Sequence, residues 1–191
     1  MTKGRLEAFS DGVVAILITI MVLELKVPER ADWAGLQAVL PKLWYYLLSF
    51  VFLGIYWNNH HHMLHVTKKV TGGVLWANLH LLFWLSLVPW LTAWMGQSHL
   101  AALPTAAYGV VLLCAAFAYW LLQGRIIAAE GPDSTLAQAV GSDWKGKLSL
   151  VFYALAVGAA FWRPWAAVVL YVVVAGMWLV PDRRIEKKIT Q

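Results

Sequence analysis

The chain has 191 residues, of which 61% are hydrophobic and only 13% are charged, and its formal net charge is +5. Because a soluble domain carries roughly 25% charged residues, this composition excludes an ordinary water-soluble protein and indicates an integral membrane protein. The basic residues are dispersed between apolar segments, which argues against a nucleic-acid-binding surface, and the single cysteine, Cys114, excludes a disulfide within one chain.

Six apolar segments follow one another, and we interpret each as a membrane-spanning helix: residues 6–25, 41–64, 70–96, 103–129, 148–162 and 164–180. A span needs about 20 residues to cross about 30 Å of hydrocarbon, so the last two segments are short. Since Arg163-Pro164 separates them, a re-entrant hairpin is the alternative, but the flanking Trp162 and Trp165 suit a membrane interface and favour two spans. The longest connection, residues 130–146, is interpreted as a loop. The sequence thus predicts one all-α membrane domain over residues 1–191.

The distribution of Lys and Arg predicts the orientation of these spans. Six spans place the N-terminus, the connections after the second and fourth spans, and the C-terminus on one side of the membrane. That side carries 11 of the 15 Lys and Arg residues, and the other side carries 4. The positive-inside rule therefore places both termini in the cytoplasm.

The first span contains two polar residues, Ser10 and Asp11, within the stretch AFSDGVVAIL. An N-cap at these residues is one interpretation, but it would leave only about 14 apolar residues for the span. We therefore expect a buried polar anchor that is hydrogen-bonded to other helices. At 100° per residue, Asp11 lies about 140° from Ile16 and points away from one common face of the helix. The residues that share this face are Phe9, Gly12, Ile16, Thr19, Ile20 and Leu23.

Donors for this anchor occur at the same depth in the second and third spans, which contain YWNNHHHMLH and WANLHLLFWLSLVPW. They are Trp57, Asn58, Asn59, His60, His61, His62 and Asn78. His61 and His65 also have the i, i+4 spacing that lets two imidazoles share a metal ion. The sequence has no H-E-x-x-H motif, no second cysteine and few carboxylates, so we favour interhelical hydrogen bonding and expect no metal site.

Three stretches carry a resemblance to a known family. RLEAFSD fits an R-x-x-x-F-S-D motif at the start of helix one, YWNNHHHM resembles a Trp-and-His signature at the end of helix two, and NLHLLFWLSLVPW resembles an Asn…Pro pattern in helix three. They cover roughly residues 5–95 in the right order. The chain therefore resembles the transmembrane protein 175 family of potassium channels, in its prokaryotic single-repeat type.

The resemblance implies a six-helix unit that assembles with copies of itself as a homotetramer around a central pore lined by helix one. It implies a multi-pass protein of the prokaryotic plasma membrane that needs no cofactor and no soluble partner. The expected permeant ion is K+, with Na+, Rb+ or Cs+ as further candidates, and the TVGYG filter of ordinary potassium channels is absent from the sequence. Carried over residue by residue, the resemblance assigns a pore constriction (Ile16, Ile20, Leu23), a selectivity position (Thr19), an anchoring motif (Arg5, Phe9, Ser10, Asp11) and interhelical partners (Trp57, His61, Asn78).

Such an arrangement suggests a mechanism for a potassium-preferring channel. A ring of Ile16 side chains would gate the pore by dewetting, and a ring of Thr19 hydroxyls would replace part of a cation's water shell. A proton-coupled or cation transporter that uses Asp11 and the histidine cluster is the alternative, although no carboxylate lies in the middle of a span. A membrane enzyme with a histidine metal site is a third and weaker hypothesis, and we expect no enzyme activity.

Overall fold

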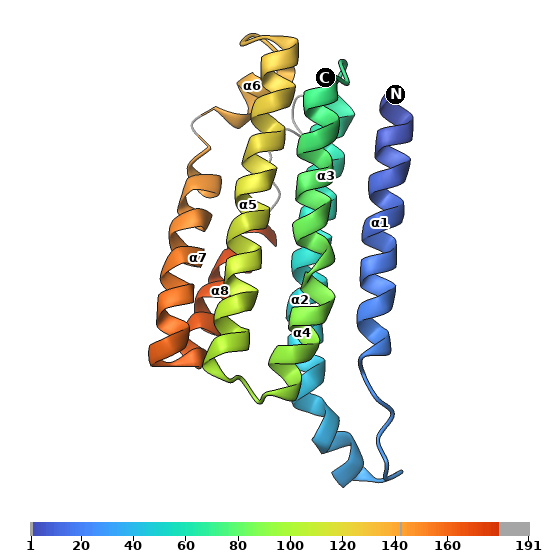
Figure 1. The fold of residues 1–191 in the computed structure, drawn as a ribbon, viewed down its shortest axis with the longest axis vertical. Helices are drawn as coiled ribbons and strands as arrows, with labels where there is room; N and C mark the ends of the chain where they lie inside the picture. The colour runs from blue at the N-terminus through green and yellow to red at the C-terminus, as the bar shows by residue number, and fades with distance from the viewer. Residues whose placement is uncertain (1, 142, 180–191) are drawn as a thin grey trace.

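The structure, a computed structural model, describes residues 2–141 and 143–179. These residues contain eight helices and no β-strand: α1 (Lys3–Leu23), α2 (Trp33–Val66), α3 (Gly72–Ser86), α4 (Val88–Gln97), α5 (Ala102–Glu130), α6 (Thr135–Val140), α7 (Trp144–Trp162) and α8 (Pro164–Leu179). Figure 1 shows the long helices running side by side, with α1 at one edge of the bundle and α7 at the opposite edge. The all-α prediction therefore holds for the described residues.

Two helices, α2 and α7, begin four or more residues before the apolar segments that predicted them. The side chain of Asp32 accepts a hydrogen bond from the backbone amide of Gly35 at 2.9 Å, so α2 begins at Trp33 and continues through Pro41. That amide, together with the Arg30 guanidinium, lowers the pKa of Asp32 below its ordinary value. Asp143 caps α7 in the same way through the amide of Gly146. In both places the polar cap, rather than the onset of apolar residues, sets the first turn.

Two predicted segments also differ in detail from the helices observed. The third segment forms two helices, α3 and α4, which meet at Leu87 because Pro89 lies in the first turn of α4 and has no backbone N–H to donate. The amide of Leu87 instead bonds the carbonyl of Trp84 at 3.2 Å, a tighter turn than the α-helix makes. The connection 130–146 is not wholly a loop, since it contains α6, whose cap Ser134 accepts from the amide of Ala137.

Helices are found on all six predicted segments, but they differ in how well they suit a membrane crossing. Four are long and apolar enough to cross: α1, α2, the α3–α4 pair and α5. The α7 helix has 19 residues and carries Lys145 and Lys147 in its first turn, while α8 is apolar and has 16 described residues. The predicted end of the last segment, residue 180, and the four basic residues of the C-terminus lie outside the described residues. Crossing by α7 and α8 therefore stays a prediction.

The core is built around α5, which packs against α3, α4, α7 and α8. Small buried residues on α7 and α8, such as Ala156, Ala160 and Ala167, let these helices approach closely. Two buried hydroxyl contacts join helices within the core: Ser49 bonds Thr92 at 2.6 Å and Tyr108 at 2.9 Å. Helices α3, α4, α5, α7 and α8 thus form the closely packed core, and α1 lies at its periphery.

Gly109 on α5 lies close to side chains of α7 and α8. We expect its replacement by alanine to destabilise the bundle. An added Cβ would lie 2.2 Å from the Oη of Tyr171 and 3.0 Å from a methyl carbon of Val157. Overpacking of this kind typically costs about 1–3 kcal/mol. Thermal unfolding of the detergent-solubilised protein measures the effect. Gly158→Ala is the matched control because its Cβ would meet nothing within 4 Å, and an equal midpoint for the two variants would contradict the prediction.

Candidate functional site

The first helix has two faces with different surroundings. One face carries a stripe of residues at helical spacing that is buried against α2, α3 and α4: Leu6, Ser10, Val14, Leu17 and Met21. On another face, about 110° around the helix, the described residues of the chain leave large apolar side chains exposed: Phe9 (50%), Ile16 (57%), Ile20 (46%) and Leu23 (78%). The face predicted from the helical period is thus the face that a single chain leaves uncovered.

Thr19 lies on the uncovered face between Ile16 and Ile20. Its hydroxyl donates to the carbonyl oxygen of Ile16 at 2.9 Å. A hydroxyl has one hydrogen to donate and two lone pairs to accept with, so the Thr19 oxygen can still interact with a cation. It is the only hydroxyl-bearing side chain on the uncovered face between Phe9 and Leu23.

A buried hydrogen-bond network joins α1 to α3 and α2 at the level of Ser10. The Ser10 hydroxyl donates to the carbonyl oxygen of Leu6 at 2.9 Å and accepts from the Nδ2 of Asn78 at 3.0 Å. The Oδ1 of Asn78 lies 2.7 Å from the Nε2 of His60. Since that oxygen can only accept, this bond requires the hydrogen on Nε2. All three side chains are almost fully buried, with exposures of 1% for Ser10, 0% for Asn78 and 5% for His60.

Asp11 makes a separate contact at the edge of the same region. The indole Nε1 of Trp57 donates to its Oδ1 at 2.9 Å. Asp11 is half-buried and Trp57 is 45% exposed. The expectation of a buried carboxylate therefore needs correction, because the residue that turns into the bundle is Ser10. Consecutive helix positions differ by 100°, so Ser10 and Asp11 cannot both face the core.

Arg5 and Phe9, the other two residues of the predicted anchoring motif, are both exposed. Phe9 lies on the uncovered face with Ile16. Neither residue takes part in the Ser10 network or the Asp11 contact within the described chain. In a single chain, the polar anchor of α1 therefore consists of Ser10 and Asp11.

His61, which the sequence favoured as the interhelical partner, does not join this network. Its exposed ring stacks on Trp57, with ring centroids 6.1 Å apart, and lies 6.2 Å from the ring of His65. His60 makes the bond to Asn78 instead, because the buried side of α2 passes through Phe52, Tyr56 and His60 at four-residue intervals. That spacing was visible in the sequence. No group of three or more His, Cys, Asp or Glu residues that could hold a metal ion is found in the described part of the chain.

The chain is similar to potassium channels along its whole length. A family model described as endosomal/lysosomal potassium channel TMEM175 matches residues 5–89. A potassium channel of Chryseobacterium sp. is 55% identical over 191 residues, which is 100% of both chains. One of Streptomyces collinus is 35% identical over 182 residues and covers 83% of this chain and 82% of the relative. The crystal structure of a lysosomal potassium-selective channel TMEM175 homolog from Chamaesiphon minutus matches with a TM-score of 0.78 at 28% identity, covering 94% of this chain and 97% of that one.

Proposed function

The chain belongs to the TMEM175 family of potassium channels, and from this premise we propose that its pore runs along the uncovered face of α1, at the centre of a homotetramer. The protein is a potassium-preferring cation channel and a multi-pass membrane protein. This membership favours a channel over the carrier that would use Asp11 and the histidines. Six spans, cytoplasmic termini and a location in the prokaryotic plasma membrane belong to the same proposal.

The observation that carries this proposal is the composition of the uncovered face. A lipid-facing helix needs only bulky apolar residues, whereas the exposed side of α1 also carries, next to the strip of Ile16 and Ile20, small side chains at three- and four-residue intervals: Ala8, Gly12, Ala15 and Thr19. Small residues at such spacing allow helices to approach closely in membranes. Four copies of α1 can therefore approach one axis, while Ile16, Ile20 and Leu23 still project from the same side.

Conduction through such a pore depends on two rings of side chains. Four Ile16 side chains would form an apolar ring that excludes water, and a hydrated cation cannot pass until the ring widens or becomes wet. One turn further on, the Thr19 hydroxyls would replace part of the water shell of K+. Hydroxyl oxygens on flexible side chains discriminate less sharply than a rigid filter, so Na+, Rb+ and Cs+ would also permeate to some extent.

The anchor would set the rotation of α1. Ser10 is bonded to Asn78 and Asp11 to Trp57, so the helix cannot turn about its axis without breaking both contacts. The uncovered face then stays directed at the axis of the tetramer. In this proposal the polar residues hold the helix and the apolar residues with Thr19 meet the ion.

Recordings from purified protein in planar bilayers test the proposal. We expect discrete cation current steps and a reversal potential that favours K+ over Na+. A mass measurement of the detergent-solubilised complex should correspond to four chains of 21.4 kDa each. The absence of cation current from assembled protein would refute the conduction pathway, and a monomeric or dimeric mass would refute the assembly.

Thr19→Val should reduce the preference for K+ over Na+ without changing assembly. The substitution removes the hydroxyl and keeps the shape, and a loss of about 1 kcal/mol, the net value of a typical hydrogen bond, corresponds to a roughly fivefold change in the permeability ratio. The reversal potential under K+/Na+ gradients measures it. Ser86→Ala is the matched control, because Ser86 is an exposed hydroxyl that also donates to the carbonyl three residues earlier but lies on α3. An unchanged reversal potential in Thr19→Val would contradict the assignment.

A further inference from the structure

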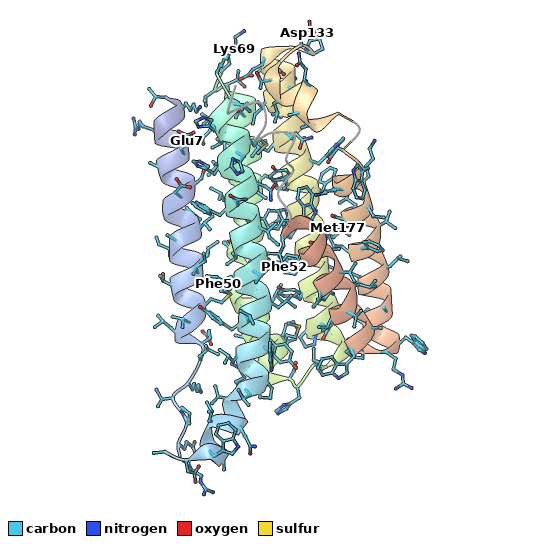
Figure 2. The ribbon with its side chains drawn as sticks, turned by 180° about the vertical axis from the view of Figure 1, so that it is seen from behind. Glu7, Phe50, Phe52, Lys69, Asp133 and Met177 are labelled. Carbon is cyan, nitrogen blue, oxygen red and sulfur yellow. The ribbon has the colours of Figure 1, made fainter. Side chains whose placement is uncertain are left out.

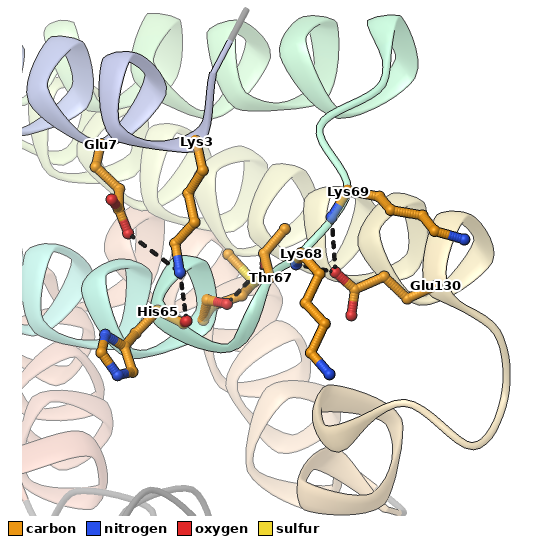
Figure 3. A network of polar contacts seen from close by, with 8 residues as sticks. Lys3, Glu7, His65, Thr67, Lys68, Lys69 and Glu130 are labelled. Atoms are coloured by element: carbon orange, nitrogen blue, oxygen red, sulfur yellow. Dashed lines mark hydrogen bonds and ion pairs between the residues drawn. The ribbon is translucent and has the colours of Figure 1, made fainter.

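Lys3, in the first turn of α1, contacts the last turn of α2. Its Nζ donates to the backbone carbonyl oxygen of His65 and lies 3.8 Å from the Oε1 of Glu7. Figure 3 shows the Lys3 ammonium between these two oxygens, and Figure 2 shows Glu7 and Lys69 at the same end of the bundle. Lys3 lies outside the R-x-x-x-F-S-D motif, and Glu7 occupies one of its unspecified positions.

The carbonyl that Lys3 binds is one that a helix cannot satisfy by itself. The last four carbonyl groups of an α-helix have no partner within the helix, and His65 is the penultimate residue of α2. A cation is also favoured at this end of the helix dipole. Lys3 therefore completes the end of α2 from a neighbouring helix.

The pairing of Lys3 with Glu7 is better explained by this contact than by the stability of α1. A Lys four residues before a Glu is the less favourable order for an ion pair on one helix. Here the Glu7 carboxylate neutralises and orients an ammonium group that reaches to another helix. The pair thus holds Lys3 in the position from which it contacts α2.

A second carboxylate, that of Glu130, holds the short connection between α2 and α3, which directly follows the turn that Lys3 contacts. The Oε1 of Glu130, the last residue of α5, accepts from the backbone amides of Lys68 and Lys69, the latter at 3.2 Å. A negative charge is disfavoured at a helix C-terminus. The hydrogen bonds from these two amides compensate for this cost and explain why a glutamate stands at the end of α5. Figure 3 shows Lys3 at the last turn of α2 and Glu130 on the short connection that follows it.

These contacts link the pore helix to the core of the bundle. Glu130 ties the α2–α3 connection to α5, around which the core is packed, and Lys3 ties α1 to the end of α2 beside that connection. Between Lys3 and Ser10, no other hydrogen bond joins α1 to another helix in the described residues. The first turn of α1 is therefore held by the buried side chain of Leu6 and by one polar contact to a neighbouring helix, that of Lys3.

We propose that Lys3 and Glu130 are positioning residues for the pore: they fix the tilt of the first turn of α1 and thereby the balance between conducting and closed states. This inference rests on the proposed function, in which α1 lines the pore. Lys3 does not face the ion, since it touches α2, so it would act on how often the channel opens and leave the choice of ion unchanged.

Single-channel recording of Lys3→Met, Lys3→Arg and Glu130→Gln tests the proposal. Lys3→Met keeps an apolar stem and removes the ammonium, and we expect a change in open probability of roughly two- to fivefold, the size that a contact between a charge and a helix terminus supports. Lys3→Arg should restore the wild-type value because it can still donate to the His65 carbonyl. Glu130→Gln should change open probability in the same direction as Lys3→Met, and the reversal potential should stay constant in all three variants.

Lys68→Met is the matched control. It removes a positive charge from the same end of the bundle, but the side chain of Lys68 makes none of these contacts, since only its backbone amide bonds Glu130. Equal effects of Lys3→Met and Lys68→Met would show a surface-charge effect on local ion concentration and would overturn the proposal, as would an unchanged open probability in Lys3→Met. If Lys3→Met does not assemble, Glu7→Gln replaces it, with a smaller change in the same direction expected.

Failure of this inference is distinguishable from failure of the proposed pore. A wild-type protein that carries no cation current would refute the pore itself. A wild-type protein that conducts and responds to substitution of Ile16, but is indifferent to loss of the Lys3 ammonium, would refute only the role of Lys3.

Discussion

Ile16→Asn should increase the resting cation current by on the order of tenfold, a change that requires only ~1.4 kcal/mol. Four isoleucines would be replaced by four amides that hydrogen-bond water, so the ring would no longer exclude water from the pore. The exposure of Ile16 is 57% in a single chain, so the substitution breaks little packing within that chain. The measurement is macroscopic current from equal amounts of assembled protein in liposomes or planar bilayers.

Two controls separate wetting of the pore from a general effect of the substitution. Ile16→Leu conserves volume and apolarity and should behave as the wild type. Val22→Asn introduces the same amide at another exposed position of α1, 44% exposed, which lies about 120° around the helix from Ile16. If Val22→Asn raised the current as much as Ile16→Asn, Ile16 would not be the constriction.

Asn78→Leu should destabilise the protein by about 2 kcal/mol, because it removes the centre of the network that anchors α1. Leucine has a similar volume, but it would leave the Nε2 hydrogen of His60 without an acceptor and would remove the donor to the Ser10 hydroxyl, which keeps only its bond to the Leu6 carbonyl. A buried polar group without a partner costs about 1–3 kcal/mol, whereas interhelical hydrogen bonds in membranes average about 0.6 kcal/mol. We expect a value between these limits, since the unfolded segments in a membrane find other partners. Unfolding in mixed micelles of increasing SDS fraction measures it.

Asn58→Leu provides the matched control for Asn78→Leu, since Asn58 is partly exposed on α2 and takes no part in the network. We expect little change in that variant. Asp11→Ala should cause a loss of stability between those of Asn58→Leu and Asn78→Leu, because Asp11 is half-buried and has one donor, Trp57. Equal losses of stability in Asn78→Leu and Asn58→Leu would contradict the role assigned to the network. A tetramer of Asp11→Ala with normal stability but altered selectivity would contradict the assignment of Asp11 to the anchor.

The uncovered face of α1 was predictable from sequence, whereas the histidine in the network that anchors α1 was not. A helix without breaks between Lys3 and Leu23 keeps a constant angle per residue, so counting residues was enough to place Ile16 and Thr19 together. Whether His60 or His61 bonds Asn78 depends on how α2 is rotated relative to α3. The sequence of the first helix does not determine that rotation. Only the spacing from Phe52 and Tyr56 along α2 indicated it.

The remaining differences between prediction and structure come from local polar groups. Apolar segments located the helices, but the caps Asp32 and Asp143 set where α2 and α7 begin. A short capped helix, α6, formed within a connection whose composition is typical of a loop. Lys3 and Glu130 carried no signal in the sequence, because a surface Lys or Glu at a helix end is usually solvated and its contact here is with backbone atoms of a distant segment.

Because α1 has two different faces, the number of residues between Ser10 and Ile16 decides which side chain faces the axis of the tetramer. Because Ser10 and Ile16 lie on one unbroken helix, a single residue inserted between Gly12 and Ile16 would rotate everything beyond it by 100°. Ala15 would then take the place of Ile16 at the axis, and Ile16 would turn onto the stripe that Leu17 now occupies. Seven inserted residues would restore the phase to within about 20° but displace the constriction by about 10 Å. We therefore expect α1 to tolerate many substitutions along its length, but no insertion or deletion between Ser10 and Ile16.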